Sequence, residues 1–139
     1  MRSVPFLIVL TLLFGCNSTI EKEQLRHLNG YWEIFEVEFP NGQKKKYGIS
    51  TTIDYIELND TIGFRKKVQP QLSGSYITSN DAERFEIYEN NGVLKMVCGQ
   101  GTQQWEAVIT SIEEHSFSVQ HMDGKIYYYK RYEPLNLQP

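Results

Sequence analysis

Cysteine is scarce in this sequence, and its scarcity argues against disulfide and zinc stabilisation. The chain has two cysteines among its 139 residues, Cys16 and Cys98. Cys16 ends an apolar N-terminal run, so Cys98 is the one thiol of the remaining chain and cannot form an intramolecular disulfide there. Because no CxxC pair or cysteine–histidine cluster occurs, the sequence predicts no metal and no cofactor. We expect Cys98 to be a small residue of the core.

The sequence also lacks the patterns that pair a nucleophile with a base. No GxSxG segment occurs, and the three histidines, His27, His115 and His121, fall on different predicted elements, where we expect surface positions. Residues 99–101 (Gly-Gln-Gly) resemble half of a phosphate-binding loop, but no lysine or helix follows them. The acidic pair at residues 113–114 falls on a predicted turn and is expected to be solvated. The sequence therefore predicts a protein that is not an enzyme.

Positive charge is not in excess. The formal net charge is −3, and it becomes −4 without the N-terminal residue Arg2. A mildly acidic chain is not expected to bind nucleic acid. Two basic clusters stand out, at residues 44–46 and 65–67. They could bind anionic lipid head groups or the carboxylate of a ligand, or they could be solvent-facing charges on edge strands that block aggregation.

The N-terminal run is apolar but too short to span a membrane, which takes about 20 residues. Arg2, the apolar residues 4–14 and the small residue Gly15 are typical of a secretory signal. An ordinary signal peptide that is cut near Gly15 is one interpretation, in which Cys16 is merely adjacent to the cut.

Residues 13–16 (Leu-Phe-Gly-Cys) resemble the lipobox of bacterial lipoproteins, although Phe14 departs from the small residues usual at its position. The resemblance implies that residues 1–15 are a signal peptide and that Cys16 becomes an acylated N-terminus. Two or more acyl chains hold a protein firmly on a membrane, and residues 16–24 would form a lipidated tether. In that family, the absence of Asp at position 17 favours the outer membrane. We therefore expect a lipid-anchored protein of the cell envelope, in the outer membrane of a Gram-negative bacterium.

The rest of the chain predicts short strands after one brief helix. The helix is expected over residues 20–28, started by a capping box at Ser18 and Glu21, with Leu25 and Leu28 on one side. Asn91-Gly92 and Asp123-Gly124 are strong hairpin turns. Runs of aromatic and β-branched residues with a turn about every ten residues predict strands at residues 31–39, 43–49, 51–58, 61–68, 72–78, 83–89, 93–98, 103–112, 116–122 and 125–132.

Hairpin-sized turns throughout favour an up-and-down order of strands over Greek keys. The predicted fold class is all-β, a small antiparallel up-and-down β-barrel over residues 25–139 with a short N-terminal helix. Alternation fails in two predicted strands, 31–39 and 51–58, where bulky residues fall on both faces. A β-bulge in each would explain this, because a bulge switches the face that a strand presents.

Gly30 and Trp32 follow the predicted helix directly and resemble the Gly-x-Trp signature of lipocalins and of bacterial lipocalin-like lipoproteins. In that family the tryptophan closes one end of the barrel, and a basic residue near the end of the last strand packs across it. Arg131 is the candidate here. The chain is shorter than most lipocalins, shows no clear second or third motif, and has no long helix after the last strand. If the domain is another small β-sandwich, Trp32 is an ordinary core residue.

A closed barrel of eight strands leaves room for one small ligand. The resemblance implies a hydrophobic or amphipathic ligand, oriented by Arg65 or Arg131. The residues expected to face inward and bind it are Tyr55, Phe64, Tyr76, Phe85, Met96, Trp105, Phe117 and Tyr128. The alternative is a side-chain-filled barrel that acts through its outer surface on a protein partner that the sequence does not identify. A cavity of a few hundred Å³ favours the ligand, whereas a packed interior with an exposed apolar patch favours the partner.

Overall fold

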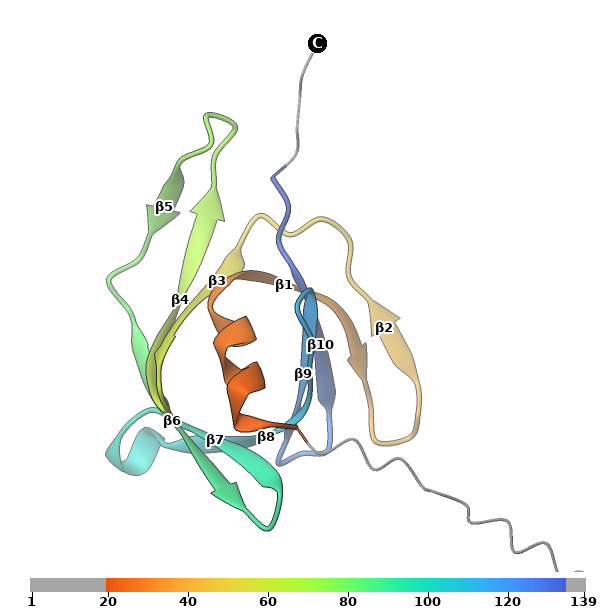
Figure 1. Cartoon of the computed structure of the whole chain (residues 1–139). Coiled ribbons are helices and arrows are strands. Elements are labelled where there is room, and N and C mark those ends of the chain that lie inside the picture. The colour runs from red at the N-terminus through yellow and green to blue at the C-terminus, as the bar shows by residue number, and fades with distance from the viewer. Residues whose placement is uncertain (1–19, 135–139) are drawn as a thin grey trace, which may run out of the picture.

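The computed structural model describes residues 20–134, which form a closed antiparallel barrel (Figure 1). In chain order its elements are η1 (Lys22–Leu28), β1 (Gly30–Glu38), β2 (Lys44–Lys46), β3 (Ile53–Asn59), β4 (Ile62–Pro70), β5 (Tyr76–Thr78), β6 (Glu83–Asn90), β7 (Val93–Cys98), η2 (Gly101–Gln103), β8 (Trp105–Ile112), β9 (Ser116–His121) and β10 (Ile126–Arg131).

Among residues 20–134, eight strands make up the ring, in the order β1, β3, β4, β6, β7, β8, β9 and β10, and β10 pairs with β1 to close it. The short strands β2 and β5 pair with β1 and β4 at the edge of this ring. Each ring strand lies beside its neighbour in the chain apart from these short insertions, which is the up-and-down order. The predicted fold class is thereby confirmed.

The helix lies across one end of the barrel (Figure 1). It is a 3-10 helix whose two leucines, Leu25 and Leu28, are buried as expected. The N–H of Glu21 donates to Oε1 of Gln24 at 2.7 Å, so the cap lies three residues later than predicted. The residue expected to start it, Ser18, lies outside the described residues. Within residues 20–134 no helix combines the length and the apolar character needed to cross a membrane.

Strand β1 bends at a β-bulge, as its two-sided sequence predicts. The register with β10 shifts between Ile34 and Glu36, so Trp32 before the bulge and Val37 after it are both buried although their positions differ in parity. The bulge predicted for the next long strand is wrong. Strand β3 pairs with β4 in continuous register from Ile53 to Asn59. Its pattern is two-sided for another reason: Asp54 takes an inward position together with Ile56, which leaves the apolar Tyr55 on the outer face.

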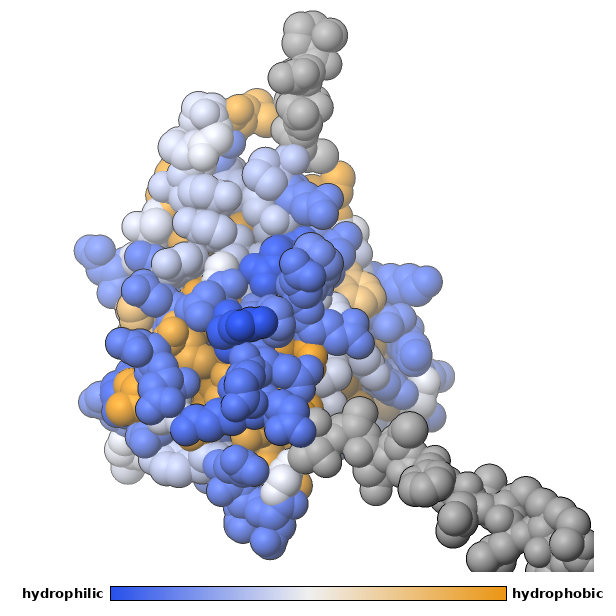
Figure 2. Space-filling model, in the orientation of Figure 1, coloured by the Kyte–Doolittle hydropathy of each residue, from blue (hydrophilic) through white to orange (hydrophobic). Residues whose placement is uncertain are grey.

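The core fills the barrel. Phe85, Cys98 and Trp32 are fully buried, and Met96 and Phe117 are nearly so. Burial raises the pKa of the Cys98 thiol to about 12, so this cysteine is a neutral core residue at ordinary pH. At the surface that carries η1, hydrophilic residues predominate and apolar residues show between them (Figure 2).

The hairpin of β4 and β5 extends beyond the ring (Figure 1). Its second strand is shorter than the predicted 72–78, because the turn continues until the N–H of Gln71 donates to the carbonyl of Ser75 at 2.8 Å. Leu72 therefore lies at the tip, where it is 89% exposed, and apolar surface is visible there (Figure 2). The predicted strand 43–49 is likewise reduced to the three lysines of β2, which face water as expected.

Candidate functional site

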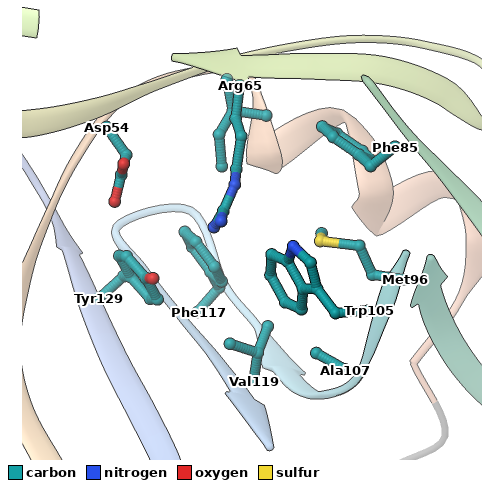
Figure 3. Close-up of a pocket in the computed structure, with 10 residues that line it drawn as sticks. Asp54, Arg65, Phe85, Met96, Trp105, Ala107, Phe117, Val119 and Tyr129 are labelled. Carbon is teal, nitrogen blue, oxygen red and sulfur yellow. The ribbon is translucent and has the colours of Figure 1, made fainter. Parts of the chain in front are cut away.

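Four of the eight residues expected to face inward do line the barrel interior. Phe85, Met96, Trp105 and Phe117 surround a central cavity together with six other side chains (Figure 3). The cavity measures about 10 Å³, which is room for about one water molecule. The barrel is therefore filled by its own side chains and holds no space for a ligand at its centre.

The other four aromatic residues face outward, which corrects the prediction. On β3 the inward positions belong to Asp54 and Ile56, so Tyr55 between them points away from the cavity. Its ring lies 4.9 Å from that of Tyr31, which stacks on Tyr76 at 4.4 Å. Successive side chains of a strand point to opposite faces, so an inward polar residue places its aromatic neighbours outside.

Phe64 and Tyr128 follow the same rule. Arg65 takes the inward position on β4, and the preceding Phe64 lies on the outer face, 6.3 Å from the ring of Tyr55. On β10 the inward position belongs to Tyr129, and the hydroxyl of Tyr128 donates to the Glu38 carboxylate at 2.7 Å outside the barrel.

The end of the barrel under η1 is closed by Trp32. Its Nε1 donates to the carbonyl of Leu28, the last residue of the helix, at 2.8 Å. The Arg131 guanidinium lies over the indole at 4.2 Å from the ring centroid. Gly30 has φ +120°, and a Cβ there would come within 2.6 Å of Arg131 Nη1. Glycine is thus required for the guanidinium to approach.

Arg131 makes four hydrogen bonds, all of them to backbone carbonyls. Its Nη1 donates to the carbonyl of Asn29 at 2.9 Å, and its Nη2 donates to the carbonyls of His27 and Glu114 at 2.8 Å each. Its Nε also donates to Glu114, at 3.0 Å. Arg131 therefore links the helix, its C-cap residue Asn29 and the turn before β9. It lines an outer groove and not the central cavity, so a role in orienting a ligand inside the barrel is not supported.

The second candidate for ligand orientation, Arg65, points into the interior toward Trp105 (Figure 3). Its guanidinium lies 4.6 Å from the indole centroid, and its Nε donates to Glu83 at 3.0 Å. Trp105 Nε1 donates to the same carboxylate at 3.1 Å. Burial alone would lower the pKa of Arg65, but Tyr129 and Glu83 outweigh it and raise the pKa, so the arginine stays charged.

His121 lies beside the cluster of Arg65, Trp105 and Glu83. It is half-buried and not at the surface, where it was expected. Its ring centroid is 5.0 Å from that of Trp105 and 4.4 Å from that of Tyr127. Burial lowers the pKa of His121, with Arg65 and Lys125 acting in the same direction and Asp123 opposing them. The alternation of β9 places residues 117, 119 and 121 on one face, which could have indicated this position from sequence.

A buried carboxylate lies next to the central cavity. Asp54 is 4% exposed, and its Oδ1 lies 2.6 Å from Nζ of Lys67. The lysine side chain is 59% exposed, so the ion pair joins the interior to solvent. A buried charge is tolerated when it is paired, and Lys67 supplies that pairing.

The barrel wall has an opening directly beside this ion pair. Strand β1 pairs with β3 at residues 30–32 and with β2 at residues 36–38. The N–H of Tyr47 still donates to the Phe35 carbonyl, at 2.9 Å, and residues 48–52 then leave the wall. The opening has a volume of about 400 Å³. It is lined by, among others, Ile34, Tyr47, Ile49, Ile53, Asp54 and Lys67.

A second hollow lies outside the barrel, between the β4–β5 hairpin and the segment that follows β10. This groove measures about 630 Å³ and includes two of the most exposed apolar side chains of the described residues, Ile49 and Leu72. Within residues 20–134, no group of three or more acidic, histidine or cysteine side chains is placed to hold a metal ion.

No protein-family profile matches this sequence, and no curated protein sequence matches it either. Two solved structures are similar. One is a lipocalin-like protein from Bacteroides uniformis, with 8% identity and a TM-score of 0.47; the other is an uncharacterized protein from Bacteroides eggerthii, with 11% identity and a TM-score of 0.48. Each alignment covers 76% of this chain and 99% of the other. Likenesses of this strength carry no information about a ligand.

Sequence reasoning missed the opening. Asp54 was not singled out, Lys67 was considered only as a member of the basic cluster at residues 65–67, and residues 47–52 were expected to continue two strands. The available signal is Asp54 itself, an acid inside the apolar run Ile53–Ile56. An aspartate there is either exposed or, if it is buried, paired with a cation. The expected lipidation site, Cys16, lies outside the described residues.

Proposed function

We propose that this protein is a membrane-anchored lipoprotein of the bacterial cell envelope that binds a small hydrophobic or amphipathic ligand in the wall opening of a lipocalin-like barrel. The observation that carries the proposal is the opening itself. Its volume of about 400 Å³ falls in the range typical of small-molecule sites, roughly 300–1,000 Å³. Apolar side chains with a few polar groups line it, which is the usual composition of such sites.

The ligand proposal is tested by what the protein carries when it is isolated. The full-length chain, purified from the bacterium that makes it, is analysed by native mass spectrometry. We expect a retained small molecule. Tyr47→Ser should release it, because Tyr47 lines the opening. The variant should still fold, because the Tyr47 side chain is 45% exposed and contributes little to the core. Retention by Tyr47→Ser at the wild-type level would contradict this site.

The envelope anchor rests on the lipobox-like residues 13–16. We expect Cys16→Ser to abolish incorporation of radiolabelled palmitate, because the sulfur that carries the acyl chains is gone. Cys98→Ser is the matched control and should incorporate palmitate normally, since Cys98 is fully buried. If Cys16→Ser incorporates as much palmitate as the wild type, the lipoprotein assignment is contradicted. The ligand-site proposal does not depend on that result.

A second candidate function is supported by a different observation, the outer groove beside Ile49 and Leu72. The packed interior together with these exposed apolar residues favours a protein partner, and 87% and 89% exposure is unusual for isoleucine and leucine in one hollow. Leu72 lines the groove but not the wall opening. Crosslinking in the host should therefore lose a partner in Leu72→Ser and keep it in Tyr47→Ser if this function is the correct one.

A further inference from the structure

The wall opening has a cation at its base that is only partly used. Lys67 lines the opening, and its ammonium has three N–H donors. One of them faces Asp54 Oδ1 at 2.6 Å, and the side chain remains 59% exposed. The buried carboxylate holds the ammonium at the opening, and the other donors are open to solvent or to a ligand.

A second cation, Lys45, does not line the opening but lies next to a residue that does. On β2, Lys44 and Lys46 are opposite Glu38 and Glu36 of β1, so each of these lysines has an acid across the strand pair. The lysine between them has none.

Lys45 is opposite the buried Val37, so its side chain leaves the strand pair on the same side as Val37 while remaining exposed to solvent. Its Nζ lies 5.2 Å from the ring centroid of Tyr47, which lines the opening. Among the residues that the structure describes, no carboxylate lies within ion-pair distance of Lys45.

The remainder of the opening is apolar. Ile34, Ile49 and Ile53 line it, and Ile34 also packs against the core. The opening thus combines a hydrocarbon wall with the ammonium group of Lys67, and the ammonium of Lys45 lies next to Tyr47 of its lining. Its one acid, Asp54, is 4% exposed and already covered by Lys67, so a cationic ligand would have to displace the lysine to reach it.

We infer that the ligand is an anionic amphiphile, a single alkyl chain that ends in a carboxylate. The chain lies against the three isoleucines, and the carboxylate binds Lys67 at the base with Lys45 beside Tyr47. This inference rests on the proposed function, since it names the chemistry of the molecule that the opening holds.

The experiment compares ligands that differ at the head group alone. The full-length protein, reconstituted in nanodiscs with empty nanodiscs as the blank, is titrated calorimetrically with decanoate, decanol and decylamine. We expect decanoate to bind about tenfold more tightly than decanol, since hydrogen bonds to a charged group exceed neutral ones by roughly that factor. Equal binding of decanoate and decanol, or tighter binding of decylamine, overturns the inference and leaves the proposed function intact. Binding of none of the three overturns the proposed site as well.

Lysine variants locate the head group. Lys67→Gln should weaken decanoate about tenfold and leave decanol unchanged. Because this variant leaves Asp54 without its cation, Lys45→Gln, which touches no buried acid, provides an independent test and should change decanoate in the same direction. Lys66→Gln is the matched control: Lys66 precedes Lys67 on β4 but lies over Tyr55 on the outer face, 5.7 Å from its ring. Equal losses in Lys66→Gln and the other two would show a non-specific charge effect and overturn the inference.

Discussion

The barrel contains two tryptophan–arginine pairs at its two ends, and the pairs differ in what completes them. Trp32 and Arg131 lie under the helix at 4.2 Å, and Trp105 and Arg65 lie toward the opposite end at 4.6 Å. Trp105 begins β8, whose last residue, Ile112, accepts a hydrogen bond from η1. In each pair the cation lies over an indole face, an arrangement worth about 0.5–2 kcal/mol.

The partners of the two pairs have different chemistry. The hydrogen bond of the Trp32 indole N–H and the four hydrogen bonds of Arg131 all go to backbone carbonyls, which the fold holds in place. Trp105 and Arg65 instead share one carboxylate side chain, that of Glu83, which is 34% exposed. A pair completed by backbone depends on the whole fold, whereas a pair completed by an exposed side chain depends on one residue and on solvent screening. The helix end is therefore a rigid closure, and the opposite end is a polar cluster that tolerates change.

The largest expected effect separates the two tryptophans. Trp32→Ala should lower the free energy of unfolding by about 3–5 kcal/mol, because it removes a fully buried side chain from the closed end. Trp105→Ala should cost about 1–2 kcal/mol, since this side chain is part-exposed. Urea unfolding of both variants measures the difference, and equal losses would remove the distinction between the two ends.

The arginines should differ in the same direction. Arg131→Met is expected to cost about 2–3 kcal/mol, because the helix, its C-cap residue Asn29 and the turn before β9 lose a shared charged donor. Arg65→Met should cost about 1 kcal/mol or less, since its ion pair with Glu83 is partly screened by solvent. A thermal melt that ranks the variants in the opposite order would contradict the comparison.

Gly30 tests whether the closed end depends on the close approach of the Arg131 guanidinium to the backbone. Gly30→Ala should cost about 2 kcal/mol, because φ +120° strains any side chain and the new Cβ would collide with the Arg131 guanidinium. Gly48→Ala is the matched control, because a Cβ there meets nothing within 4 Å and no unusual φ is required. Chemical denaturation of both should show a loss at Gly30 alone.

The smallest effect is a pH dependence at the polar cluster. Burial lowers the pKa of His121 from its usual 6.5, so the unfolded chain takes up this proton at higher pH than the folded chain does. The contribution of neutral His121 is complete above about pH 6.5 and is lost as the pH falls toward the folded pKa. Between about pH 7.5 and about pH 5.5, the wild type should therefore lose more stability than His121→Gln in urea unfolding. Parallel losses would show that His121 does not titrate differently in the fold.

Most of the ring was predictable, because its signals are local. Glycine and asparagine at turns set the hairpins, and Asn91 and Gly92 do adopt the positive φ that their turn requires. The two-sided pattern around Phe35 predicted the bulge of β1. The faces of the strands were less predictable. Tyr55 and Phe64 were assigned to the interior on hydrophobicity, and both lie outside because Asp54 and Arg65 occupy the inward positions.

The sequence alone determined an antiparallel barrel, a helix that ends at Leu28 and a glycine before Trp32, since alternation, turn residues and caps act within a few residues of one another. Tertiary structure decided that the interior is filled, that two polar residues enter it, and that the wall opens where residues 48–52 leave β1. The physical reason is that burying a charge is favourable only beside its partner. Lys67 and Glu83 reach Asp54 and Arg65 only when distant strands have paired.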